Sequence, residues 1–272
     1  MVEQLQYLYG PLALITLGLL FWRPALGIAL LVAIFPMDPW GPRLPVPGVN
    51  TETILIGVAL AVTVLRFGAR LPPLRYSAPI VAFITVMFMA FAVSIPWARS
   101  MQGVDGVPAV WVIFKTWKSI SFTAFLFFSV YWWCRTEEDR ARVLQGLCIG
   151  LFLSSVAGIL DFAIDINPFG IEGRASGFVA DPNALAESIG SMMFVPLYLI
   201  MRGREFSVTW RAFAAGCYAL SALVIVISLS RGNWIAFLAA HFVFLLLVNR
   251  ALLVGAIVAF LLVVTIGFPL LP

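Results

Sequence analysis

The amino-acid sequence contains little charge, little histidine and little cysteine. Only 11% of its 272 residues are charged and 62% are hydrophobic, whereas a soluble domain has about 25% charged and about 45–50% apolar residues. These values exclude an ordinary globular protein, a disordered chain and a disulfide-rich secreted scaffold. The remaining class is a polytopic membrane protein. The formal net charge of +4 is too small to indicate binding of nucleic acid.

The small number of histidine, lysine and cysteine residues argues against several kinds of catalytic and metal-binding site. His241 alone cannot build a multi-histidine metal site, and neither Lys115 nor Lys118 follows a glycine as a Walker A motif requires. We therefore expect no metal and no cofactor. His241 lies about ten residues into an apolar segment, which favours a buried side chain bonded to a neighbouring helix over a catalytic one. Asp161 and Asp165, one helical turn apart, favour solvation at a helix end over cation binding. The three cysteines form no C-x-x-C pair and are interpreted as small apolar residues.

Long apolar runs predict membrane helices, because about 20 apolar residues in a helix span the hydrocarbon. Eight such runs are predicted at 52–69, 78–96, 110–133, 143–164, 184–201, 212–230, 232–249 and 251–270. The stretch 5–35 is too long for one crossing, and Trp22-Arg23-Pro24 interrupts it. We expect two short helices there, with Pro24 at the start of the second. The chain is thus predicted as a single transmembrane domain over residues 1–272, an all-α bundle of about nine or ten helices.

Arginines alternate between the connections, and this alternation predicts orientation. One set of connections holds Arg23, Arg66, Arg70, Arg75, Arg135, Arg140, Arg142, Arg202, Arg204, Arg211 and Arg250. The other set holds Arg43, Arg99, Arg174 and Arg231, with Lys115 and Lys118 just inside a helix start. The richer set is expected in the cytoplasm, so Arg174 and Arg231 are expected together on the opposite side of the membrane.

The segment 172–187 is not explained by membrane spanning. Asp181 can cap a helix and Pro182 can occupy its first position. Two glycines flank Arg174 and let the backbone turn closely around a ligand. A helix N-terminus beside an arginine suits an anion. An ordinary capped loop, in which the arginine pairs with Glu172 or Asp181, fits the residues equally well.

A second unexplained feature is the short connection before the helix predicted at 232–249. It places Arg231 at the outer boundary, where an arginine either marks function or reaches lipid headgroups with Trp234 as an interfacial anchor. Together with Arg174, Lys115 and Lys118, it puts cations on the side that ordinarily has few. A polyanionic ligand explains this arrangement most simply, and guanidinium groups suit a diphosphate.

These segments resemble the motifs of a known family. Gly173-Arg-Ala-Ser-Gly-Phe-Val-Ala-Asp-Pro-Asn-Ala-Leu-Ala186 resembles the R-x-x-G-x-x-x-(D/N)-P-N-x-(L/F)-A element of the O-antigen ligase and polymerase superfamily, and Ser228-Leu-Ser-Arg-Gly232 resembles its S-R-(G/A) motif. The motif residues are Arg174, Gly177, Asp181, Pro182, Asn183, Ser230, Arg231 and Gly232, with Glu187 directly after the first motif.

The resemblance implies a multi-pass glycosyltransferase of the bacterial inner membrane, with its active side facing the periplasm. Such an enzyme moves a glycan from undecaprenyl diphosphate to lipid A core, another glycan or a protein. Arg231 matches the family's pyrophosphate-binding arginine, and Arg174 and Asn183 match the loop motif. In that family a large periplasmic loop with the catalytic histidine follows the matched helices. This sequence stops at Pro272, so we expect the N-terminal portion of a longer ligase and leave the general base unassigned.

Three alternatives remain open. A polysaccharide polymerase of the same superfamily would carry the same motifs, because acceptor choice depends on the loop beyond them. A transporter or flippase would show internal repeats and broken helices near the midplane, which are not evident. A membrane scaffold without chemistry would not gather Arg174, Arg231 and Lys118.

Two structural expectations follow. Arg231, Arg174 and one of the two lysines should line one cavity. A stripe of small residues should face another helix; it consists of Ala215, Gly216, Ala219 and Ala222.

Overall fold

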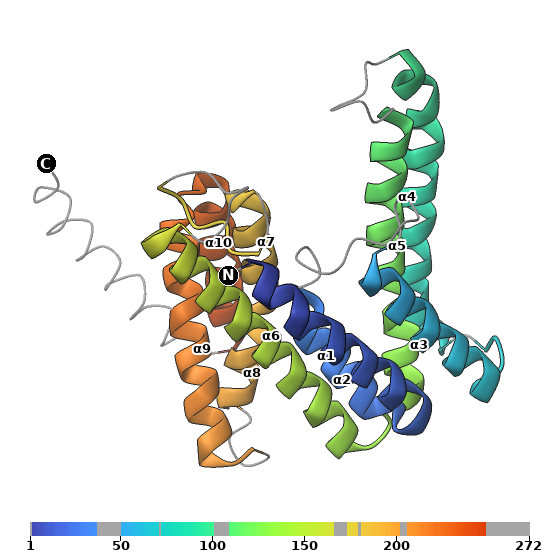
Figure 1. The fold of residues 1–272 in the computed structure, drawn as a ribbon, viewed down its shortest axis with the longest axis horizontal. Helices are drawn as coiled ribbons and strands as arrows, with labels where there is room; N and C mark the ends of the chain where they lie inside the picture. Colours follow the sequence, from blue (N-terminus) through green and yellow to red (C-terminus); the bar gives the residue numbers. More distant parts are fainter. Residues whose placement is uncertain are drawn as a thin grey trace, which may run out of the picture.

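The computed structural model describes residues 2–36, 50–70, 72–100, 109–165, 173–178, 181–201 and 206–248. Within these ranges the chain forms ten α-helices and no strand (Figure 1). They are α1 Val2–Trp22, α2 Pro24–Ile34, α3 Thr51–Phe67, α4 Leu74–Ser100, α5 Ala109–Trp133, α6 Glu137–Ile164, α7 Pro182–Met192, α8 Phe194–Met201, α9 Val208–Ile227 and α10 Arg231–Val248. The predicted all-α bundle is confirmed, and the helix predicted at 251–270 lies outside the described residues.

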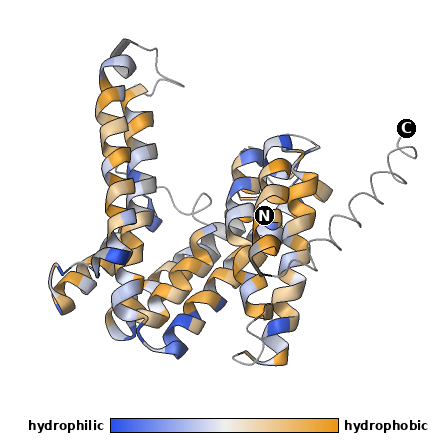
Figure 2. Ribbon diagram, turned by 180° about the vertical axis from the view of Figure 1, so that it is seen from behind, coloured by the Kyte–Doolittle hydropathy of each residue, from blue (hydrophilic) through white to orange (hydrophobic). Residues whose placement is uncertain are grey.

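The bundle has the composition of a membrane protein. Four stretches are long and apolar enough to cross a membrane: Ser77–Trp97, Glu137–Ile164, Pro182–Met201 and Val208–Ile227. Hydrophobic residues predominate along the helices (Figure 2), and many large apolar side chains are more than half exposed. An apolar surface of this extent is unfavourable in water and is typical of contact with lipid.

Proline explains the two helix breaks of the described chain. Arg23 lies between α1 and α2, and Pro24 begins α2, as predicted. The run predicted at 184–201 is long and apolar enough to span, as predicted, but it is not one continuous helix, because α7 ends at Met192 and α8 begins at Phe194. Pro196 lacks an N–H to donate to the carbonyl four residues earlier, which is that of Met192. The apolar run continues across this break, so hydropathy alone does not reveal it.

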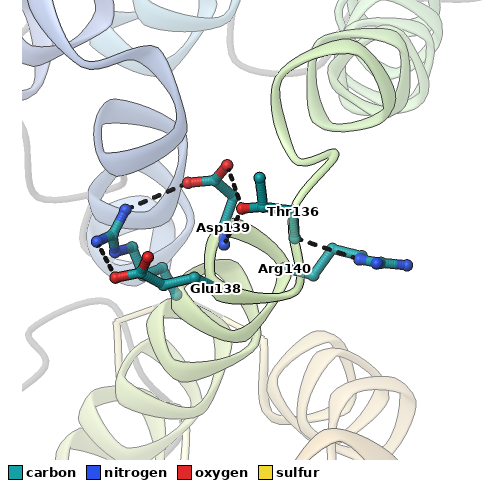
Figure 3. Close-up of polar contacts among 5 residues, drawn as sticks. Thr136, Glu138, Asp139 and Arg140 are labelled. Carbon is teal, nitrogen blue, oxygen red and sulfur yellow. Dashed lines mark hydrogen bonds and ion pairs between the residues drawn. The ribbon is translucent and has the colours of Figure 1, made fainter.

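The start of α6 also differs from the prediction, which placed it at residue 143. Thr136 caps the helix: its hydroxyl accepts from the backbone N–H of Asp139 at 3.1 Å and donates to the Asp139 carboxylate at 2.7 Å (Figure 3). Arg142 pairs with both Glu138 and Asp139 one turn away. Acidic residues in the first turn stabilise a helix N-terminus. This polar turn extends α6 to Glu137, beyond the apolar run.

Glycines bring α2 and α6 into close contact. A Cβ on Gly146 would lie 2.2 Å from the carbonyl oxygen of Ala29, and one on Gly150 would lie 2.7 Å from that of Val32. Gly146 and Gly150 form a G-x-x-x-G motif, which permits helix backbones to approach in membranes. The pair holds α2 against the middle of α6, and α1 packs on α2.

The predicted small-residue stripe on α9 is wrong for three of its four residues, whereas Ala222 is partly buried against the core. Ala215, Gly216 and Ala219 are exposed, and a Cβ on Gly216 would meet nothing within 4 Å in the described structure. The buried face of α9 instead consists of Ala214, Cys217, Ser221, Val224 and Ile225. This face also has helical spacing, but it is rotated away from the small residues, so spacing alone selected the wrong face.

The three cysteines are buried free thiols. Cys217 lies where α9 meets α6, and its sulfur is 3.4 Å from the carbonyl oxygen of Cys148. Cys134 lies in the connection between α5 and α6. Burial and the charge of Asp139 raise the pKa of its thiol to about 12, and Arg140 acts weakly in the opposite direction. Their burial fits the interpretation as small apolar residues.

Candidate functional site

The first motif is held against the end of α6 by a buried carboxylate. One oxygen of Asp161 accepts the backbone N–H groups of Ser176 at 2.7 Å and of Gly177 at 3.0 Å. Asp161 is only 4% exposed, so the prediction of a solvated helix end is wrong for this residue. Asp165 is exposed, as predicted. We call residues 173–178 the motif loop. It folds back over α6, where its backbone N–H groups donate to the carboxylate of Asp161.

Gly177 gives the motif loop the turn that this contact needs. Its φ of +59° lies in the left-handed region, which favours glycine. A Cβ at this position would lie 3.1 Å from the backbone nitrogen of Gly158 on α6. The expectation that glycine lets the backbone turn closely is confirmed, although what it approaches is α6.

The second motif begins with a tight turn between α9 and α10. Residues 228–230, which we call the serine turn, contain Leu229 at φ +54° and the buried Ser228 and Ser230. The indole of Trp234 donates to the carbonyl of Ile225 at 2.7 Å across the turn. Arg231 is the first residue of α10, and its side chain is exposed.

The two motifs meet, although they are distant in sequence. Arg174 donates from Nε to the carbonyl of Ser228 at 2.8 Å, and the N–H of Ala175 donates to the carbonyl of Ile227 at 3.3 Å. The side chain of Asn233 donates to the carbonyl of Asn183 at 3.0 Å. The motif loop, α7 and α10 therefore gather at one end of the bundle (Figure 1).

Arg174 and Arg231 thus lie at the same end, as predicted. Arg140, in the first turn of α6, lies at the opposite end of that helix from the motif loop. The salt bridges that Arg140 and Arg142 form with acidic residues lie in the first turns of α6. Arg174 instead uses the Ser228 carbonyl and donates to the side-chain oxygen of Asn183 at 3.1 Å. No salt bridge joins Arg174 to Asp181 in the described chain, and Glu172, the other predicted partner, lies outside the described residues.

The helix after the motif loop begins as predicted. Asp181 caps α7 by accepting the N–H of Asn183 at 2.8 Å, and Pro182 occupies the first position. Glu187 is exposed on α7, and a Cβ on Gly232 would meet no described atom within 4 Å. The start of α7 therefore offers a partial positive charge next to the side chain of Arg174.

The predicted lysines belong to another part of the bundle. Lys118 lies on α5 and donates from Nζ to the hydroxyl of Thr53, in the first turn of α3, at 2.8 Å. Lys115 lies three residues earlier on α5, and its side chain is outside the described residues. The cavity predicted to join a lysine with Arg174 and Arg231 stays a prediction.

His241 takes the structural role predicted for it. Its Nδ1 lies 2.8 Å from the carbonyl oxygen of Phe237, and its Nε2 lies 2.7 Å from the hydroxyl of Tyr218 on α9. Because a carbonyl can only accept, Nδ1 carries the proton and Nε2 accepts from the tyrosine. Both nitrogens are therefore occupied within the bundle.

Two residues that hold the motifs in place, Asp161 and Asn233, were not assigned this role from the sequence. Asp161 lies within an apolar helix, and its only sequence signal is a carboxylate deep enough to need a partner. Asn233 directly follows the S-R-G motif, and its donation to the Ser230 hydroxyl at 2.9 Å connects α10 to the serine turn.

The fold and this site define a class: an all-α membrane protein in which a loop and a helix junction are joined into one polar unit. No family model, curated protein or solved structure matches the chain. The functional assignment therefore depends on the residues of the joined motifs.

Proposed function

We propose that this chain is the transmembrane part of an O-antigen ligase-type glycosyltransferase. It would move a glycan from undecaprenyl diphosphate to an acceptor on the periplasmic side of the bacterial inner membrane. The observation that carries the proposal is the contact between the two motifs, through the hydrogen bond from Arg174 to Ser228. Motifs that bind one substrate must lie together in space, and here two segments with the family's sequence pattern do so.

Arg231, Arg174 and the N-terminus of α7 would each contribute to binding a diphosphate. Arg231 presents an exposed guanidinium, which suits bidentate binding of phosphate oxygens. Arg174 is oriented by Ser228 and Asn183, and the N-terminus of α7, where Asp181 already accepts the N–H of Asn183, adds the positive end of the helix dipole. These groups would also stabilise the charge that grows on the leaving diphosphate during transfer.

The reaction balances as a displacement at the sugar. A hydroxyl oxygen of the acceptor attacks the anomeric carbon, the bond from that carbon to the diphosphate oxygen breaks, and a base removes the hydroxyl proton. His241 does not serve as that base, because it is bonded to Phe237 and Tyr218 and lies about 15 Å along α10 from Arg231. The base remains unassigned, as expected from the sequence.

The test is transfer from a lipid-linked donor by the full-length protein in membranes. Arg231→Lys should lose most activity, because lysine keeps the charge and loses the bidentate geometry. The matched control is Arg140→Lys, at an exposed position at the other end of α6, and this variant should keep its transfer activity. Undiminished transfer in both Arg231→Lys and Arg231→Ala would overturn the proposal. Supplying either lipid A core or a second lipid-linked repeat as acceptor separates a ligase from a polymerase.

A further inference from the structure

A cavity of about 300 Å³ lies beside the joined motifs. It is formed where α6 and α7 meet the end of α2 and the start of α3. Four polar side chains line it, those of Asn50, Glu52, Ser154 and Ser188. The rest of its lining is apolar and includes the rings of Phe35 and Phe178.

The cavity and the motif loop share residues. Phe178 belongs to the motif loop, four positions after Arg174, and is held in place through the bonds of Asp161 to the neighbouring backbone. Leu185, two positions after Asn183, lines the cavity from α7. The cavity therefore borders the motif loop and the first turn of α7, the two segments that carry Arg174 and Asn183.

We propose that the cavity holds one sugar ring, the one attached directly to the diphosphate of the lipid-linked donor. This inference rests on the proposed function and names the part of the substrate that the cavity recognises. The other parts of the donor, its prenyl chain and its outer sugars, lie elsewhere.

The lining has the chemistry that a sugar ring needs. A carboxylate, an amide and two hydroxyls can hydrogen-bond to ring hydroxyls, and carboxylate acceptors make the stronger bonds. The rings of Phe35 and Phe178 can cover the apolar C–H faces of a pyranose. Glu52 is only 9% exposed, so this carboxylate is a built part of the interior.

The size of the cavity argues against the whole prenyl chain as the occupant. The volume is at the lower end of the range of small-molecule sites, which is about 300–1,000 Å³, and a long prenyl chain does not fit into it.

The experiment compares two probes on the full-length protein in nanodiscs: undecaprenyl diphosphate alone and the same lipid carrying N-acetylglucosamine. In the wild type the glycosylated probe should bind about tenfold more tightly, which corresponds to two or three modest hydrogen bonds. Ser188→Leu, which fills the cavity, should remove this difference and leave the Kd of the bare lipid unchanged. The matched control is Ser191→Leu, an exposed serine one turn along α7 that does not line the cavity, and it should change neither Kd.

Glu52→Gln provides a second test with nearly unchanged volume. It should weaken binding of the glycosylated probe about fivefold, because a neutral acceptor replaces a carboxylate, and spare the bare lipid. Equal weakening of both probes in Ser188→Leu would overturn the inference, since the cavity would then hold the prenyl chain. Unchanged binding of both probes in both variants would overturn it as well.

Failure of the proposed function has a different signature. If the wild type binds neither lipid, or if Arg231→Lys binds the bare lipid as well as the wild type does, the diphosphate site is refuted. The cavity is then tested by itself with free N-acetylglucosamine. Thermal stabilisation of the wild type that is lost in Ser188→Leu would support sugar binding, and no stabilisation of either would overturn it.

Discussion

The helices α6 to α10 and the hairpin of α4 and α5 are held together in different ways. In the first region, buried polar contacts join distant segments, as between Asp161 and the motif loop or between the hydroxyls of Ser155 and Ser221 at 3.0 Å. In the hairpin, α4 packs on α5 through rings such as Phe91 and Trp117, whose centroids are 5.4 Å apart. None of the residues in the apolar 18-residue stretch of α4 is buried within the protein.

The comparison separates the part of the structure that is fixed by contacts within the protein from the part that depends on contact with lipid. Polar contacts between side chains and backbone have a preferred geometry, so the end of the bundle that carries the motifs has one arrangement. The exposed apolar surface of α4 instead needs lipid, and hydrophobic burial has no preferred direction. Substitutions in the two regions should therefore respond to different conditions.

The largest effect is expected on α4. Met89 is 61% exposed in the middle of this helix, and Met89→Lys would place a charge in hydrocarbon, at a cost of about 2.5–3.5 kcal/mol for insertion. The measurement is the fraction of chains inserted into microsomes, with Met89→Leu as the control. Full insertion of Met89→Lys would show that this face of α4 does not contact lipid.

The next largest effect is expected where α2 meets α6. Gly146→Ala would place a Cβ 2.2 Å from the carbonyl oxygen of Ala29, so the helices must separate, at a cost of about 2–3 kcal/mol. Gly216→Ala is the matched control, because its new methyl group meets nothing among the described atoms. Thermal unfolding in detergent should show a lower midpoint for Gly146→Ala alone, and equal midpoints would contradict the close contact.

A smaller effect is expected for the carboxylate that holds the motif loop. Asp161→Asn keeps an acceptor oxygen but loses the charge, so stability should fall by about 1–2 kcal/mol. Asp165→Asn is the control four residues later, since asparagine tolerates the left-handed conformation found there. Limited proteolysis should cut the motif loop faster in Asp161→Asn. Cleavage at the wild-type rate would mean that this bond does not hold the loop.

The smallest effect is expected for the hydroxyl that contacts His241. Tyr218→Phe removes one hydrogen bond between α9 and α10, which in membrane proteins contributes about 0.6 kcal/mol on average. Transfer activity should be unchanged, because the bond lies far from Arg231. A loss of activity greater than tenfold, without loss of folded protein, would return His241 to consideration as a catalytic residue.

The sequence was sufficient where one local rule acts without competition. Pro24 begins a helix, Asp181 caps one, and both follow from backbone chemistry within a few residues. The start of α6 escaped prediction because hydropathy finds apolar residues, whereas Thr136 and Glu138 extend the helix through polar contacts. Apolar runs therefore predict membrane helices better than they predict helix ends.

Tertiary contacts were harder to predict because several patterns compete for each helix face. Both Gly146-x-x-x-Gly150 and the small residues of α9 permit close packing, and only the first is used in the described structure. Asp161 was hard to assign for a similar reason. Its neighbours in sequence are apolar, and the two backbone N–H groups that donate to it belong to the motif loop, whose turn had to be known first. The meeting of the two motifs was predicted as a shared side of the membrane and a shared cavity, and not as direct hydrogen bonds between the two segments.

The hydrogen bond from Arg174 to Ser228 also has a consequence for biosynthesis, because it joins residues 54 positions apart. At about 5–20 residues per second, the ribosome adds this stretch in about 3–10 s. During that interval the nascent chain already contains Asp161 and the motif loop, while Arg174 still has no carbonyl acceptor. A chain that terminates before Ser228 would carry the first motif, complete in sequence, without its partner. The two motifs become one unit only when α10 enters the bundle.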